Sequence, residues 1–354
     1  MAAYTTIDNP ELYFQVKIWT GTGSSNALTL DGDTDMQPDY VMIKQRSSTQ
    51  QWNGYDSIRG VQKYIGWNTN IAENTQSQGL TAFGSDGFTV GTDDMVNKSS
   101  STYVAFCWKA NGSGSSNTEG NTDTTISANT TAGFSIIDGC DDLNDDDTFG
   151  HGLNSTPDMV FLKRLDDVAG WRVFYTGITD GSTLILDTTA AVGDDGATVG
   201  PVSSTLITVE GSGTGGNEGD NENVAYAWHS VQGYSKIGKY TGNSSTDGPF
   251  VYLGFRPAFV MIKNVTSAQQ WFIIDNKRST YNPSHYAVLP NDNAAEYTGQ
   301  ATNYSIDILS NGFKPRTSGT TSANANNATS NDYLYMAFAE APFVNSNGVP
   351  NNAR

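Results

Sequence analysis

Residues 38–44 read Pro-Asp-Tyr-Val-Met-Ile-Lys, and a tryptophan follows eight residues after the lysine. The same succession of proline, apolar run, lysine and tryptophan, with both spacings unchanged, occurs at three places: Pro38, Lys44 and Trp52; Pro157, Lys163 and Trp171; Pro257, Lys263 and Trp271. Each run between proline and lysine has the length and apolar character of a buried strand. Chance is a poor explanation for two spacings kept in three copies, so we expect one supersecondary unit that has been used three times.

Further strand and turn signals surround each copy. The first copy opens at residues 16–19 and closes at 103–108, and the third opens at 239–242 and closes at 334–339, with alternation typical of strands at both ends. Between these ends, Ser-Asp-Gly-Phe begins at Ser85 and Ser-Asn-Gly-Phe begins at Ser310. Asp-Gly and Asn-Gly favour the positive φ of a tight hairpin, so these turns are a second marker of the repeat.

Short strands, many turn signals and the absence of helical periodicity predict an all-β protein. We expect three tandem antiparallel β-sandwich repeats of jelly-roll, lectin-like type, covering residues 1–112, 113–232 and 233–354. The second repeat is the divergent one and follows a linker rich in Gly, Ser, Thr and Asn, and the third includes the C-terminal tail. A single body around a pseudo-threefold axis is the competing architecture. Copies of about 100 residues suit independent sandwiches, so we favour separate domains in series.

The composition restricts the partners. There are 19 Lys and Arg residues against 37 Asp and Glu residues, which gives a net charge of −18. Nucleic acid and anionic membranes need clustered cations, so we expect neither as a partner. No apolar run approaches the length of a membrane span, and residues 1–10 lack the features of a signal peptide, which predicts synthesis in a cytoplasm. Cys107 and Cys140 fall in different repeats, and we expect isolated thiols instead of a disulfide.

One polar constellation recurs in the first and third copies. Asp and Arg follow the tryptophan at the same distances in both, giving the set Trp52, Asp56, Arg59, Trp271, Asp275 and Arg278. One hypothesis is a sugar-binding pocket, with charged groups holding the hydroxyls and tryptophan stacking on the ring. The other is an ion pair that fixes a loop, with the tryptophan in the core. We favour the structural interpretation, because a pattern shared between tandem copies is usually fold-determining; the second copy has Tyr175 and Ile178 instead.

Other polar segments predict no chemistry. Residues 138–147 carry enough carboxylates for calcium, but they depart from the EF-hand pattern, so we interpret them as a solvated acidic loop, like residues 211–223. The three histidines, His151, His229 and His285, have no metal-binding or triad spacing. We therefore expect no cofactor, no metal site and no enzymatic activity. A glycosidase-type carboxylate pair stays open, because separation in space is invisible in a sequence.

The third copy carries a family resemblance. Residues 255–263 (Phe-Arg-Pro-Ala-Phe-Val-Met-Ile-Lys), Trp271, the turn at 310–313 and residues 335–343 (Tyr-Met-Ala-Phe-Ala-Glu-Ala-Pro-Phe) resemble an uncharacterised repeat domain. That domain occurs in virion and tail-fibre-like proteins of marine tailed bacteriophages, including those of cyanobacteria. The resemblance covers nearly the whole chain and implies a lectin-like sandwich on the surface of a virion, with no catalytic residues to transfer.

These observations lead to a hypothesis and two competitors. We expect a bacteriophage virion surface protein, a tail-fibre or appendage component that attaches to glycans of the host surface. Its partners would be other virion proteins, capsid or tail subunits, and further copies of itself, with a trimer as one arrangement. The first competitor is a purely structural decoration or connector protein, with residues 4–14 as its docking segment. The second is a depolymerase that trims surface polysaccharide.

Overall fold

The computed structural model describes residues 4–178, 182–193, 198–210, 221–299, 303–318 and 326–352. Within these ranges the chain is nearly all β, which confirms the prediction of an all-β protein. The helical elements there are short: the 3-10 helix η1 (Pro10–Leu12) and the α-helix α1 (Asp94–Asn97). Among the described residues no helix has the length and hydropathy of a membrane span. Cys107 and Cys140 are free, buried thiols, as expected.

We call residues 1–112 region 1, and its strands form two main sheets. The first sheet has the order β1 (Phe14–Thr20), β9 (Thr102–Trp108), β3 (Tyr40–Gln45) and β4 (Asn53–Asp56). The second has the order β2 (Asn26–Thr29), β8 (Gly87–Val90) and β7 (Leu80–Gly84). A separate pair joins β5 (Lys63–Tyr64) to β6 (Asn74–Thr75). All of these pairings are antiparallel.

Region 2, residues 113–232, also has a larger and a smaller antiparallel sheet. The larger one runs β10 (Ser115–Asn117), β11 (Thr124–Asn129), β12 (Phe134–Asp138), β19 (Asn223–Trp228), β14 (Met159–Arg164), β15 (Arg172–Tyr175) and β16 (Leu184–Ile185). The smaller one runs β13 (Thr148–Gly150), β18 (Leu206–Glu210) and β17 (Thr198–Val202).

Region 3, residues 233–354, repeats the plan of region 1. Its larger sheet runs β20 (Ser235–Thr241), β26 (Asp332–Pro342), β22 (Phe255–Asn264) and β23 (Trp271–Asp275). Its smaller sheet runs β21 (Val251–Tyr252), β25 (Gly312–Pro315) and β24 (Ile306–Leu309).

The three apolar runs lie on β3, β14 and β22, which occupy corresponding places in the three larger sheets. Each of these strands pairs with the closing strand on one side and with the strand beside the conserved tryptophan on the other. Val41 lies opposite Cys107, Val160 opposite Ala227 and Val260 opposite Ala337. The proline-to-lysine spacing therefore marks one strand position that occurs in all three regions.

Two glycines fix the hairpins of the smaller sheets. Gly87 has a φ of +118°, a backbone conformation that L side chains rarely adopt. A Cβ on Gly87 would collide with the carbonyl of Leu28, and one on Gly312 would collide with the carbonyl of Val251. These close approaches explain why Asp-Gly and Asn-Gly stand at the two turns.

The apolar strands are buried on both faces. On β3, Tyr40 and Met42 face one hydrophobic cluster, while Val41 and Ile43 face another. Strand β14 does the same with Met159 and Phe161 against Val160 and Leu162. In region 3 the pair Phe259 and Met261 opposes Val260 and Ile262. A strand with two buried faces reads as a continuous apolar run instead of an alternating one, which is what all three stretches show.

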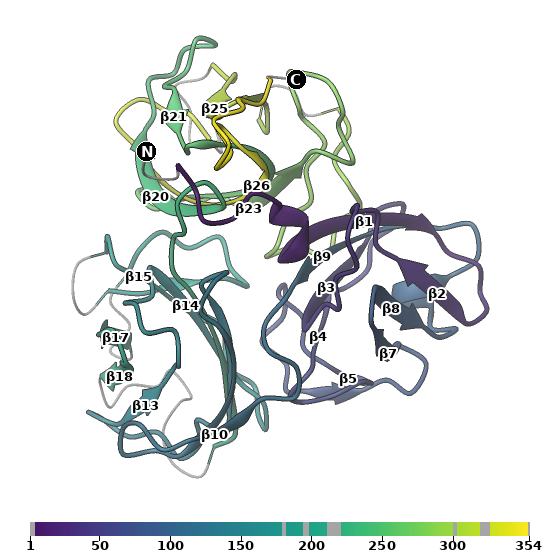
Figure 1. Ribbon diagram of the computed structural model, residues 1–354, viewed down its shortest axis with the longest axis vertical. Helices are drawn as coiled ribbons and strands as arrows, with labels where there is room; N and C mark the ends of the chain where they lie inside the picture. The colour runs from purple at the N-terminus through teal and green to yellow at the C-terminus, as the bar shows by residue number, and fades with distance from the viewer. Residues whose placement is uncertain are drawn as a thin grey trace.

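One face of each strand belongs to a core that the three regions share. Three hydrophobic clusters each contain residues of a single region. A fourth cluster contains residues of all three regions. Aromatic contacts cross it, including Tyr40 with Tyr226 at 4.3 Å and Phe106 with Phe259 at 5.0 Å between ring centroids. The expectation of separate domains in series is therefore wrong. Figure 1 shows the three regions grouped around a common centre, the competing architecture of the sequence analysis.

Candidate functional site

The three regions meet at three junctions, which we call the 1–2, 2–3 and 3–1 seams. At each seam the indole of the conserved tryptophan donates a hydrogen bond to a backbone carbonyl of the neighbouring region. Trp171 donates to Gly66 at 2.8 Å, Trp271 to Ile185 at 3.2 Å and Trp52 to Leu289 at 2.8 Å. Every region is thus a donor at one seam and an acceptor at another, and the chain closes into a ring.

A loop from one region also docks on the next at each seam. The contact residue of the neighbour always stands two positions after the conserved lysine. The Glu73 N–H donates to the Leu165 carbonyl at 2.7 Å, Val192 to Val265 at 3.1 Å, and Glu296 to Arg46 at 2.8 Å. Leu165, Val265 and Arg46 are therefore equivalent positions with different side chains.

The 3–1 seam is closed by a network of ion pairs. Glu296 binds Arg46 of region 1 through two hydrogen bonds, at 3.1 and 2.8 Å, and Arg278 of its own region at 2.8 Å. Arg278 also pairs with Asp275. Burial alone would raise the pKa of Glu296, but the two arginines hold it below its usual value. At this seam each charged side chain of the network therefore has an oppositely charged partner within the network.

The 2–3 seam is apolar where the 3–1 seam is charged. Tyr175 and Ile178 stand where the other copies have Asp and Arg. They pack on the shared core together with Val192 and Val265, the two residues of the docking contact. This seam closes without the ionic set.

The 1–2 seam combines the ionic set with an open cavity. Arg59 pairs with Asp56 at 2.6 Å and with Glu73 at 2.8 Å, and Lys63 reaches the second oxygen of Glu73 at 2.9 Å. Asp56 also accepts the hydroxyl of Tyr226, from region 2, at 2.7 Å. Burial lowers the pKa of Arg59, but Asp56, Tyr226 and Glu73 outweigh it and keep the guanidinium charged.

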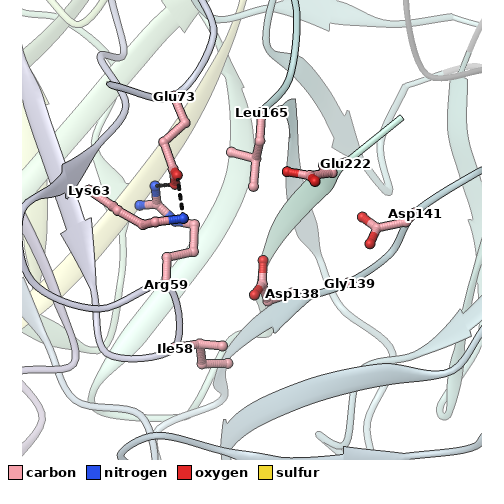
Figure 2. Close-up of a pocket in the computed structure, with 9 residues that line it drawn as sticks. All are labelled: Ile58, Arg59, Lys63, Glu73, Asp138, Gly139, Asp141, Leu165 and Glu222. Atoms are coloured by element: carbon pink, nitrogen blue, oxygen red, sulfur yellow. Dashed lines mark hydrogen bonds and ion pairs between the residues drawn. The ribbon is translucent and has the colours of Figure 1, made fainter. Parts of the chain in front are cut away.

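A cavity of about 330 Å³ lies beside the ion pairs that Glu73 makes with Arg59 and Lys63. The equivalent of Arg46 is Leu165, so no guanidinium fills the space. Nine residues of regions 1 and 2 line the cavity: Ile58, Arg59, Lys63, Glu73, Asp138, Gly139, Asp141, Leu165 and Glu222. Figure 2 shows the carboxylates of Asp138, Asp141 and Glu222 facing the space opposite the Lys63–Glu73 pair.

Three backbone positions bring these carboxylates together. Asp138 ends strand β12, Glu222 stands immediately before β19, and Asp141 accepts the N–H of Asn223, the first residue of β19, at 2.8 Å. Burial is the main cause that raises the pKa of Asp138 to about 6, and the negative charge of Asp56 adds to it. Burial also raises the pKa of Asp141. The cavity therefore holds carboxylates that lack full solvation and can accept hydrogen bonds from a ligand.

Of the six residues that the sequence suggested for a sugar-binding pocket, one lines this cavity and the others are buried. Arg59 lines it, whereas Asp56 lies behind Arg59 with its side chain fully buried. Trp52 and Trp271 are 0% and 1% exposed, so neither indole is accessible for stacking on a sugar. Asp275 and Arg278 form a buried ion pair at the other charged seam.

Sequence reasoning missed most of the cavity. Lys63, Asp138, Asp141, Leu165 and Glu222 come from segments that are far apart in the sequence and meet only through the seam. A comparison of the positions two residues after the three lysines would have shown that the copies differ there, with Arg46, Leu165 and Val265. In the described part of the chain no group of three His, Cys, Asp or Glu side chains can hold a metal ion. Of the acidic loop 211–223, residues 211–220 lie outside the described residues.

The fold and the cavity define an all-β protein with three regions around a shared core and a polar cavity at one seam. The chain belongs to the family described as Domain of unknown function (DUF7483), whose model matches residues 9–342. No curated protein and no solved structure matches the chain.

Proposed function

We propose that the protein is a surface component of a tailed-bacteriophage particle, a tail-fibre or appendage protein that attaches to glycans on the host. The resemblance of residues 255–263 and 335–343 to virion proteins motivates the setting. The observation that carries the binding role is the polar cavity at the 1–2 seam, with about 330 Å³ of space and charged groups that converge on it.

The lining of this cavity suits saccharide hydroxyls. The carboxylates of Asp138 and Glu222 accept hydrogen bonds, and Lys63, with 51% of its side chain exposed, can donate them. Ile58 and Leu165 offer apolar surface for the C–H groups of a sugar ring. A small number of polar groups placed around a concave site is the usual basis of ligand specificity.

The charge of the cavity selects among sugars. Four carboxylates, those of Glu73, Asp138, Asp141 and Glu222, oppose the two cations Arg59 and Lys63. Both cations are already paired with Glu73, so an arriving ligand meets a negative field. We therefore propose neutral or amine-bearing saccharides as ligands, because uronates and phosphorylated sugars would be repelled.

We also propose that the three regions are copies of one lectin-like sandwich of jelly-roll type. The common order of opening, closing, apolar and tryptophan-flanked strands supports this origin. One weak site on each chain becomes useful when many chains sit on one particle, because effective concentration rises without new contacts. Other virion proteins and further copies of the chain are the proposed partners.

A glycan array and labelling of host cells with fluorescent protein test the proposal. We expect the wild-type protein to bind neutral or amine-bearing glycans, and we expect Asp138→Asn combined with Glu222→Gln to lower the affinity by about tenfold or more, since both substitutions remove charged acceptors. Asp35→Asn is the matched control, because Asp35 is an exposed carboxylate outside the cavity. Failure of the wild-type protein to bind any glycan or to label cells would overturn the attachment role.

The alternative is a purely structural decoration or connector protein that docks through residues 4–14. Residues 4–14, the segment nominated for docking, pack on their own chain: Thr5 donates to the Gln232 carbonyl at 3.0 Å, and Ile7 is buried in the shared core. A decoration protein without receptor binding would be retained on particles and would leave host cells unlabelled. Release of reducing sugar from host polysaccharide would instead identify a depolymerase, and we expect none.

A further inference from the structure

We propose that a groove formed mainly by region 3, with Tyr4 of region 1 and Ser230 and Gln232 of region 2 at its edge, is a second saccharide site with Tyr252 as its stacking platform. This inference rests on the proposed function for its ligand class, but it concerns residues of a different surface. The groove has a volume of about 420 Å³ and lies between β20, β21 and the N-terminal segment, which Figure 1 shows beside these strands. Its lining residues are Tyr4, Ser230, Gln232, Ser235, Lys236, Ile237, Tyr252, Leu253 and Gly254.

The aromatic wall of the groove is held in place. The hydroxyls of Tyr4 and Tyr252 are hydrogen-bonded to each other at 2.7 Å, and the Tyr4 hydroxyl also donates to the Gly254 carbonyl at 3.3 Å. The Lys236 ammonium donates to the Tyr252 carbonyl at 2.7 Å and lies 5.4 Å from the centre of the Tyr252 ring. These contacts orient the ring although Tyr252 remains 47% exposed.

The groove combines the two surfaces that a sugar needs. A pyranose presents C–H groups on its faces and hydroxyls around its edge, so a binding site must offer an aromatic face beside hydrogen-bonding groups. Tyr252 supplies the face, and tyrosine has a rigid apolar ring with a polar tip. Gln232 is an exposed amide at the rim, and Lys236 carries three N–H donors, of which one goes to the Tyr252 carbonyl.

Region 1 shows that the fold does not require these aromatic residues. The hairpin register pairs Thr29 with Gly87 and Tyr252 with Gly312, so Thr29 and Tyr252 are equivalent. Two positions earlier, Ala27 corresponds to Phe250. All four side chains are exposed, but region 3 places large aromatic rings where region 1 has alanine and threonine. The Phe250 and Tyr252 rings lie 6.5 Å apart between centroids and form one exposed apolar patch that the fold does not need, and contiguous patches of this kind are where binding surfaces occur.

The charge of the groove differs from that of the seam cavity. Among the described residues that line it, Lys236 is the charged one. A single cation beside an aromatic face admits neutral and anionic saccharides, whereas the seam cavity repels anionic ones. The two sites therefore predict different ligand preferences on one chain.

A glycan array with neutral, amine-bearing and uronate-bearing oligosaccharides tests this inference. Tyr252→Ala is expected to lower binding by about tenfold for the glycans that use the groove, because the stacking face is lost. Tyr252→Phe keeps the face and should stay within about threefold, and Lys236→Gln should act most strongly on uronates. Tyr281→Ala is the matched control, since Tyr281 is 84% exposed and lies outside the groove.

The outcomes separate the two proposals. If Tyr252→Ala binds every glycan as the wild-type protein does, the groove inference is wrong. If Asp138→Asn lowers binding while the groove variants do not, the seam site stands alone. If the wild-type protein binds no glycan at all, both proposals fail. Thermal unfolding of each variant shows whether a loss of binding comes from loss of structure, and a folded Lys236→Gln variant with unchanged uronate binding would also contradict the inference.

Discussion

The 3–1 and 1–2 seams share a backbone plan but differ in what fills them. Both carry the Asp-Arg-Glu set, and in both the glutamate N–H donates to the neighbouring region. At the 3–1 seam, Arg46 occupies the space and binds Glu296 through two hydrogen bonds. At the 1–2 seam the equivalent residue is Leu165, and a cavity lined with carboxylates remains. The residue at this position is thus one difference between a closed ion-pair network and an open cavity.

The 2–3 seam shows that the charged set is not needed for closure. Ile178, Val192 and Val265 pack there on the shared core. Buried ion pairs are often no more stabilising than well-packed apolar residues of similar size. Closure of the ring therefore does not by itself account for the ionic set at the 1–2 seam.

The largest expected effect comes from Glu296→Gln. This change leaves Arg46 without its carboxylate and removes one of the two carboxylate partners of the fully buried Arg278, so we expect the free energy of unfolding to fall by about 3 kcal/mol or more. Glu73→Gln is the matched variant at the 1–2 seam. Glu73 likewise pairs with a buried arginine, Arg59, but the second cation that the change releases, Lys63, is 51% exposed and returns to water, so we expect a loss that is smaller by about 1 kcal/mol. Urea denaturation measures both, and equal losses would break the comparison of the two seams.

A smaller effect is expected from pH. Burial lowers the pKa of Lys263 to about 7 and that of Lys44 and Lys163 to about 8. The unfolded chain binds more protons than the folded one above pH 7, so these lysines make stability rise with pH. For Lys263 the slope is about 1 kcal/mol per pH unit between about pH 7 and 8, where most ordinary cysteine thiols are still protonated.

The contribution of Lys263 is isolated by comparing Lys263→Met with the wild-type protein. Both are unfolded in urea at several pH values, and the variant should show the smaller rise in stability. Its ammonium normally donates to the Thr189 carbonyl across the 2–3 seam at 2.9 Å, so some constant loss of stability is expected as well. Parallel pH profiles for the two proteins would show that Lys263 stays fully charged in the folded state.

The smallest effect concerns ligand binding at the 1–2 seam. The pKa of Asp138, raised to about 6, means that this carboxylate gains a proton between pH 7 and 5. Protonation removes a charged acceptor, so affinity for the cavity ligand should fall by about threefold over this range. Isothermal titration with a glycan identified on the array measures it. Asp138→Asn should bind more weakly and without this pH dependence; an unchanged midpoint in the variant would assign the titration to another group.

The sequence predicted the strands better than their arrangement. The spacing of proline, lysine and tryptophan located β3, β14 and β22, and the Gly87 and Gly312 turns located two hairpins. The shared core was missed because the length of each copy was given more weight than the pattern within its strands. Tyr40 to Ile43 is apolar at every position, and a strand with one solvated face would alternate.

The cavity was predictable only in part. Arg59 was found because its spacing from Trp52 recurs in the third copy. Asp138 and Glu222 have no such counterpart, and they approach Arg59 only because regions 1 and 2 share a seam. Contacts between distant segments of this kind depend on the packing of whole regions, which spacing within a single copy does not encode.

The most direct test of the account is glycan binding by Leu165→Arg, measured on the array beside the wild-type protein. The new guanidinium would stand where Arg46 stands at the 3–1 seam, facing Glu73 and the cavity carboxylates. We predict that binding of neutral and amine-bearing glycans falls by about tenfold or more; the melting temperature falls as well, because Leu165 packs in the shared core, so binding is compared below the unfolding transition. A folded variant that binds these glycans as well as the wild-type protein would contradict the assignment of the 1–2 seam as the binding site.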